Sequence, residues 1–203
     1  ANRLMSGCTG CVASTTALLH LSFYAILPII PLWLVRRFDA DEEFLSIFGL
    51  VEIAAAALIA SQTSRIVRWI GARPAIAISL ALTGVAAIVI AVAPNLSATL
   101  VAAAISGAAW TAGSISVFMF FNENTPPENV THFSTAYNQV VSLSIFVGPL
   151  VGSQLADLMP DLSVVLLMGA ALRLVAAALI SLDLFGRPRV TPQPEADALS
   201  VSG

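Results

Sequence analysis

Two ionisable residues lie deep inside long apolar stretches of the chain, Glu52 and Arg173. An ionised side chain near the centre of a bilayer costs about 2.5–3.5 kcal/mol on insertion scales, so such residues usually pair, face a bundle interior or serve transport. Counted at about 1.5 Å per residue from the ends of their stretches, Glu52 lies roughly 12 Å deep and Arg173 roughly 17 Å deep. Glu52 can carry a coupling proton or contact a solute, or it can be a static partner of Arg173 or of a helix backbone. Arg173 is expected to be structural.

A second pattern with chemical potential is the C-x-x-C formed by Cys8 and Cys11. Such a pair can bind a metal or cycle as a disulfide. The chain has no further cysteine, and the nearest histidine, His20, lies inside an apolar run. These cysteines are therefore interpreted as incidental small residues, and we expect no metal and no cofactor.

A third pattern is Ser106 followed by Gly107, which is similar to the nucleophile segment of intramembrane serine proteases. The leading glycine of that segment is absent, and the last apolar stretch contains no histidine to act as a base. Because a serine nucleophile needs a base within hydrogen-bond reach, no catalytic dyad can form. The chain is not expected to be an enzyme.

The composition indicates whether water or lipid surrounds the segments that carry these residues. The chain has 203 residues, of which 58% are hydrophobic and 10% charged, with a mean hydropathy of +0.90. A water-soluble fold would leave a very large apolar surface exposed, so most of the chain is expected in lipid. All nine basic residues are arginines and the net charge is −3, which gives no basic face for nucleic acid. We expect an all-α protein with one six-span membrane domain, residues 12–186, and spans at residues 12–35, 44–66, 75–93, 96–121, 131–155 and 162–184.

The segment between the second and third spans fixes the orientation. Gly71 supplies a tight backbone position here, so the segment is predicted as helix, turn, helix. Arg65, Arg68 and Arg73 lie around Gly71, and an excess of arginine beside a span marks the cytoplasmic side. With this segment inside, the inner segments contain six arginines and the outer ones two. Both termini, residues 1–11 and a tail of disordered composition at residues 187–203, are then cytoplasmic, and the protein is expected in the plasma (inner) membrane.

The first span carries a polar, kinked face. His20, Tyr24, Pro28 and Pro31 follow one another at spacings of four, four and three, which places them on one side of a helix. Proline frees backbone carbonyls that neighbouring protein or cavity water must satisfy. The bend is therefore expected to face protein, either as part of a site or simply as a packing feature.

Several of these segments resemble one family. Residues 64–73 resemble the loop G-x-x-x-D-R-x-G-R-R of major facilitator superfamily transporters, with matches at Gly71 and Arg73 and departures at Ser64, Arg68 and Trp69. Residues 27–33, 121–126 and 147–153 are similar to the first helix, the fourth-to-fifth loop and the fifth helix of one half of such a transporter. The resemblance extends over about residues 12 to 186.

The resemblance implies a secondary transporter that moves a small solute, such as a sugar or a drug-like compound, by alternating access between two six-helix halves. The degenerate loop, the absent initiator methionine and the polar tail favour the carboxyl-terminal half. A six-span subunit that pairs with a second copy or a sister subunit is the other arrangement. The alternative function is a non-transporting six-helix scaffold or assembly subunit.

The resemblance also implies roles for individual helices. The first and fourth helices of such a half line the cavity, the second and fifth contact the other half, and the third and sixth face outward. The loop arginines of the family commonly pair with an acid at the end of the fourth helix, so Arg65, Arg68 or Arg73 is expected to reach Glu123 as a latch, or else to contact lipid headgroups. The candidate solute or coupling residues are Glu52, His20, Tyr24, Trp110, Thr111, Ser114 and Asn138, although hydroxyl groups can also bond to their own helix and aromatic rings can simply pack.

Overall fold

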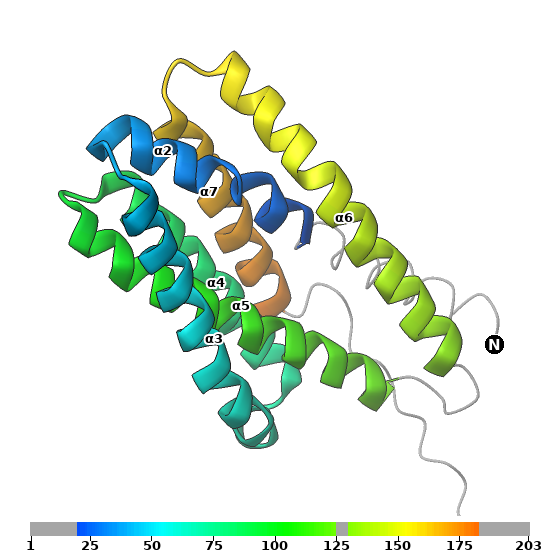
Figure 1. Ribbon diagram of the computed structural model, residues 1–203. Helices are drawn as coiled ribbons and strands as arrows, with labels where there is room; N and C mark the ends of the chain where they lie inside the picture. The colour runs from blue at the N-terminus through cyan, green and yellow to red at the C-terminus, as the bar shows by residue number, and fades with distance from the viewer. Residues whose placement is uncertain (1–19, 125–129, 183–203) are drawn as a thin grey trace, which may run out of the picture.

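The structure of the protein is a computed structural model that describes residues 20–124 and 130–182, and in these residues every regular element is helical. The first span covers His20–Phe38, and its second part is α2, Ile29–Phe38. All six spans are long and apolar enough to cross a membrane, which confirms the predicted all-α, six-span membrane fold. The remaining helices are α3 Glu42–Ile70, α4 Ala72–Val92, α5 Leu96–Asn124, α6 Val130–Leu158 and α7 Leu162–Ser181 (Figure 1).

The first span is broken rather than gently kinked. Its helix stops at a turn formed by Leu27 and Pro28 and resumes at Ile29. Pro28 has no N–H to continue the helix, whereas Pro31 lies in the first turn of α2, where an N–H would have no helical acceptor. Residues 20–26 are therefore joined to α2 by a proline turn and not by an unbroken run of helix.

Acidic side chains begin two of the helices. Asp41 accepts a hydrogen bond from the Phe44 amide at 2.8 Å, and Glu42 and Glu43 add negative charge at the positive end of α3. Asp161 begins α7 and accepts bonds from the hydroxyl and the amide of Ser163 at 2.6 and 2.9 Å. These two donors hold the pKa of the Asp161 carboxyl below its usual range.

A single residue joins α3 to α4. Gly71 has φ +88°, a backbone conformation that side chains other than glycine rarely adopt. Arg65 and Arg68 therefore lie on α3 itself, and Arg73 lies in the first turn of α4. The helix–turn–helix predicted for this basic segment is present in its tightest form.

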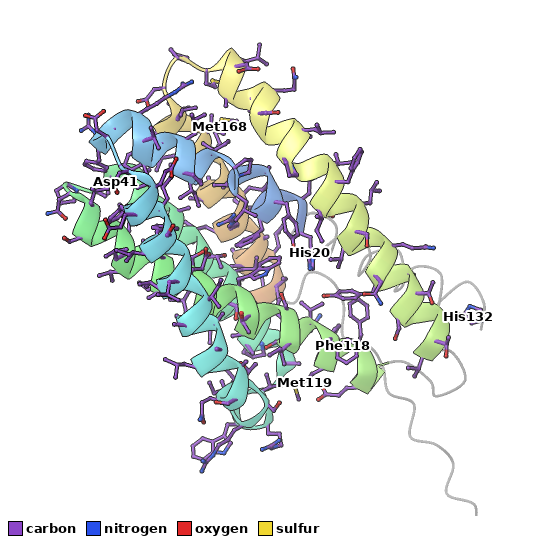
Figure 2. All side chains as sticks on the ribbon, in the orientation of Figure 1. His20, Asp41, Phe118, Met119, His132 and Met168 are labelled. Atoms are coloured by element: carbon purple, nitrogen blue, oxygen red, sulfur yellow. The ribbon has the colours of Figure 1, made fainter. Side chains whose placement is uncertain are left out.

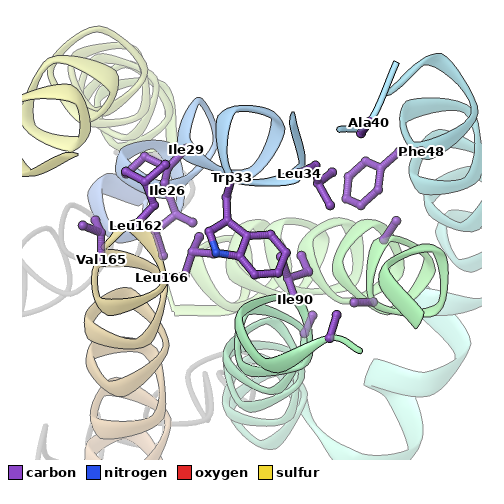
Figure 3. Packing of buried hydrophobic residues seen from close by; sticks show 14 residues of the cluster. Ile26, Ile29, Trp33, Leu34, Ala40, Phe48, Ile90, Leu162, Val165 and Leu166 are labelled. Carbon is purple, nitrogen blue, oxygen red and sulfur yellow. The ribbon is translucent and has the colours of Figure 1, made fainter. Parts of the chain in front are cut away.

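The largest buried cluster joins the first span to α3, α4, α5 and α7 (Figure 3). Trp33 packs among Ile90 and Leu166, while Leu34 lies beside Phe48. Many of the other buried positions on these helices are alanine, which lets helix backbones approach closely where packing drives association. This block of α3, α4, α5 and α7, hereafter the packed block, is the most closely packed part of the described bundle.

Every described helix leaves some apolar side chains exposed, and the most extensive exposed rows lie on α3 and α6. On α3, Leu50, Ile53 and Leu58 are 67%, 68% and 75% exposed, and on α6, Leu143 and Phe146 are 63% and 70% exposed. Figure 1 shows α6 standing off from α3 and α4, with the first span and α7 nearer to it. Lipid or another membrane protein is the only surface that covers such faces favourably.

Candidate functional site

Aromatic rings from three helices meet on one side of the bundle. Phe23 of the first span stacks on Trp110 of α5 with ring centroids 3.7 Å apart and an interplanar angle of 13°. His20 lies edge-on to Trp110 at 5.2 Å and edge-on to Tyr137 of α6 at 5.8 Å. Tyr24 lies edge-on to Trp110 at 5.6 Å. We call His20, Phe23, Tyr24, Trp110 and Tyr137 the aromatic cluster.

The cluster has a buried side and an open side. His20 is 1% exposed and Phe23 is 8% exposed, whereas Tyr24, Trp110 and Tyr137 are only half-buried. Figure 2 shows His20 at the N-terminal end of the first span, on the side of α5 and α6. The open side therefore presents aromatic faces for stacking and two phenol groups for hydrogen bonding. Such a surface can bind an aromatic or sugar ring.

Helix spacing explains why the first span supplies three of these rings. The spacing from His20 is three residues to Phe23 and four to Tyr24. All three side chains therefore lie on one face of the helical segment before the turn at Pro28. That face meets α5 through Trp110 and α6 through Tyr137. This face lies before the turn at Leu27 and Pro28.

Two glycines bring α6 close to the first span. A Cβ added at Gly148 would lie 2.6 Å from the Tyr24 Cβ, and one added at Gly152 would overlap the Ala25 carbonyl. The pair is spaced by four residues, so both glycines lie on the same face of α6. This close approach keeps α6 beside the first span, and Tyr137, which comes earlier on α6, lies near the cluster.

Glu52 lies at the contact between α3 and α5. Its Oε1 atom accepts a hydrogen bond from the Ser106 hydroxyl at 3.2 Å. Gly107 allows the contact, because a Cβ there would overlap the Glu52 carbonyl. Ser106 precedes Trp110 by one helical turn, so the carboxylate and the aromatic cluster are connected along α5.

Arg173 is not bound to Glu52. Its guanidinium donates to the carbonyls of Thr83 at 3.1 Å and Ser22 at 3.2 Å, and it lies 5.1 Å from the centroid of the Phe23 ring. The alternative of a static Glu52–Arg173 pair is therefore not what the structure contains. The reason is rotational: Glu52 faces α5, whereas Arg173 faces the first span and α4.

A small pocket adjoins the buried side of the cluster, between α4, α5 and α7. Its walls include Phe23 and Trp110 from the cluster and Ser114 from the sequence prediction. Of the other predicted residues, Thr111 is half-buried on α5, and Asn138 is exposed on α6 beside Tyr137. Ser114 is thus next to the cluster on its inner side, whereas Thr111 and Asn138 are not among the residues that line this pocket.

The basic segment meets the end of α5. The Arg73 guanidinium lies 6.0 Å from the centroid of the Phe120 ring, and Glu123 follows one turn later on α5 with an exposed side chain. Arg65 and Arg68 are exposed at the end of α3. The latch between one of these arginines and Glu123 stays a prediction.

Sequence reasoning missed Phe23 and Tyr137. Asn138 was the residue predicted from the fifth span, and Tyr137, one residue earlier on the helix, points about 100° away from it. Phe23 is apolar and was hidden among other apolar residues. The signal that could have found Phe23 is its spacing of three from His20, the same face that carries Tyr24.

Metal chemistry finds no support in the described residues. Within residues 20–124 and 130–182, no three His, Cys, Asp or Glu side chains lie close enough together to hold a metal ion. Cys8 and Cys11 lie outside the described residues.

Comparison with known proteins agrees with the architecture. The family model of the Major Facilitator Superfamily matches residues 12–201, which is nearly the whole chain. No curated protein matches the chain significantly. Six apolar helices, the single-glycine turn between α3 and α4, and this match together show that the chain belongs to the Major Facilitator Superfamily and is a membrane transporter protein.

Proposed function

We propose that the chain is a six-helix half of a secondary active transporter that moves a small ring-containing solute by alternating access, with proton coupling through Glu52. The aromatic cluster is the solute site, and its open side is completed by a second six-helix half. The observation that carries the proposal is the meeting of half-buried Tyr24, Trp110 and Tyr137 from three helices.

The uncovered helices support the second half as a partner. Apolar side chains on α3 and α6 are exposed along both helices, and these are the second and fifth spans that contact the other half in the family. A second copy of the chain or a sister half can cover them. The solute would then lie between the two halves, where access can alternate by their rocking.

Glu52 is suited to carry a proton because its partner is neutral. The hydroxyl of Ser106 can donate to an ionised carboxylate and can also accept from a protonated one. A cationic partner would instead favour the ionised form. Proton binding at Glu52 would change the α3–α5 contact one helical turn from Trp110, which links coupling to the solute site.

The charge distribution supports a cytoplasmic location for the α3–α4 turn. Between Glu52 and Glu123 the only charged residues are Arg65, Arg68 and Arg73. At the other end of the same helices lie Asp39, Asp41 and neighbouring acids. By the positive-inside rule this asymmetry favours a cytoplasmic arginine end and, with six spans, both termini on the cytoplasmic side of the plasma membrane.

The experiment uses the full transporter reconstituted into proteoliposomes, with radiolabelled glucose and the planar aromatic cation ethidium as probes. Glu52→Gln keeps the size of the side chain and removes its titration. We expect an imposed pH gradient to drive accumulation of a probe in the wild type but not in Glu52→Gln, while exchange of that probe without a gradient is retained. Glu43→Gln is the matched control, since this carboxylate is exposed in the first turn of α3.

Unchanged gradient-driven accumulation in Glu52→Gln would refute proton coupling at this residue. Absence of transport or binding of both probes, together with wild-type behaviour of Trp110→Ala in every assay, would instead favour the non-transporting scaffold. The two outcomes separate the coupling role from the solute site.

A further inference from the structure

Arg173 joins three helices although it comes from the last span. It is 4% exposed and lies near the middle of α7. One guanidinium nitrogen donates to the Thr83 carbonyl of α4, and another donates to the Ser22 carbonyl of the first span. The planar fork of arginine presents donors in fixed directions, so one side chain can hold two neighbouring backbones at once.

Arg173 also contacts the aromatic cluster. Its guanidinium carbon lies 5.1 Å from the Phe23 centroid, within the range of a cation–π interaction. Phe23 stacks in turn on Trp110 at 3.7 Å, and Trp110 meets His20 and Tyr24 edge-on. A continuous column of contacts therefore runs from α7 to the open side of the cluster.

The packing around Arg173 is arranged for this reach. Gly84 follows Thr83 on α4, and a Cβ there would lie 3.2 Å from the Ala170 carbonyl of α7. The close approach of the two helices brings the Thr83 carbonyl within hydrogen-bond distance of the guanidinium. The remaining nitrogen, Nε, is buried without a hydrogen-bond partner, so the side chain is held by the two carbonyls and the Phe23 ring.

Arg173 holds a segment that is joined to α2 through a proline turn. Ser22 and Phe23 lie before this turn at Leu27 and Pro28, where the run of helical residues is interrupted. A contact from outside the first span can therefore help this segment to keep its orientation. Arg173 attaches it to α4 and α7, two helices of the packed block.

We propose that Arg173 is a positioning residue for the solute site: by anchoring the Ser22–Phe23 backbone and ring to α4 and α7, it sets the orientation of Trp110. This role rests on the proposed function, because Trp110 must contact the solute. It differs from a purely structural arginine, since its removal is expected to move one particular ring and to weaken solute binding.

The test reports on Trp110 directly. In a background with Trp33→Phe and Trp69→Phe, Trp110 is the remaining tryptophan of the chain. Arg173→Met keeps the length of the side chain and removes its donors and charge. We expect the acrylamide quenching constant of Trp110 to rise about two-fold as the site loosens locally, and the apparent KM for the transported probe, ethidium or glucose, to rise about ten-fold.

Three variants make the result specific. Arg173→Lys keeps the charge and can reach one carbonyl, so it should restore part of both effects. Arg37→Met removes an exposed arginine and should change neither. Leu166→Ala opens a cavity in the core on α7, the helix that also carries Arg173, and should lower thermal stability without raising the quenching of Trp110.

Each outcome has one consequence. Unchanged quenching of Trp110 in Arg173→Met, or an equal rise in Leu166→Ala, would overturn the anchor. Raised quenching with an unchanged KM would overturn the positioning role. Because quenching is measured without solute, failure of Trp110→Ala to alter transport would count against the proposed solute site and leave the anchor standing.

Discussion

Both the packed block and α6 approach a neighbouring helix closely at glycine residues. The faces beside these glycines are buried in the packed block but exposed on α6. In the packed block, Gly107 meets the Glu52 backbone and Gly113 meets Ser79, and neighbouring alanines extend these contacts along the helices. On α6, Gly148 and Gly152 meet the first span, but the faces on either side are exposed. The aromatic cluster lies where these two regions meet. A helix attached at few points can move against a rigid block without repacking its core, and such motion would reshape the cluster.

The largest effect on stability is expected inside the packed block, where close helix contacts leave no room for an added methyl group. Gly107→Ala places a Cβ against the Glu52 carbonyl and should destabilise the protein by about 1–3 kcal/mol through overpacking. Gly49→Ala is the matched control on α3, since nothing lies within 4 Å of its added Cβ. That control should be neutral or stabilise by about 0.5–1 kcal/mol, the usual gain of alanine over glycine in a helix. Thermal unfolding in detergent measures both, and equal behaviour of the two variants would contradict the close α3–α5 contact.

The next effect concerns the boundary between the two regions. Trp110→Ala removes the ring that joins α5 to the first span and should raise the apparent KM for a transported probe about ten-fold, equivalent to ~1.4 kcal/mol. Trp69→Ala is the matched control, because Trp69 is 84% exposed at the end of α3. Transport kinetics in proteoliposomes measure the effect. Equal changes in both variants would remove the aromatic cluster from the solute site.

A smaller effect on stability is expected on α6. Gly152→Ala places a Cβ on the Ala25 carbonyl, but α6 has few other contacts to lose and can shift outward. We expect a loss of stability below about 1 kcal/mol, because the overpacking cost is partly relieved by this shift, together with clear loss of transport. Thermal unfolding and transport of the same sample test this difference from Gly107→Ala. A stability loss as large as that of Gly107→Ala would show that α6 is held as firmly as the packed block.

The smallest effect is expected at the link from α6 to α7. The pKa of Asp161 is held below its usual value, about 3.9, by the Ser163 hydroxyl and amide. Its contribution to stability is therefore fully present above about pH 3.9 and lost as the pH falls through the lower folded-state pKa. Asp161→Asn keeps a good helix cap without the titration. Unfolding measured from neutral to acid pH should show a shallower acid loss in the variant, and parallel curves would refute the assignment.

The sequence by itself determined the solvent, the number of spans and the family. Six apolar stretches in a chain with few charges leave no soluble alternative, since a helix is the open-ended element that satisfies its own backbone in lipid. Gly71 between two long helical patterns was sufficient to predict the tight turn, because a positive φ is a local property of one residue. His20, Tyr24 and Trp110 could be named as candidates from their types and from the family resemblance.

Only the tertiary structure decided which of these residues meet. The joining of Glu52 to Ser106 rather than Arg173, the stacking of Phe23 on Trp110, and the arrival of Tyr137 beside His20 depend on how each helix is rotated about its axis. A rotation by one residue is about 100°, which moves a side chain from one neighbour to another without altering the hydropathy of the span. Apolar periodicity is weak in a helix surrounded by lipid on one side and apolar neighbours on the other. The contacts were therefore set by glycine and alanine positions on different helices acting together, which no single stretch of sequence contains.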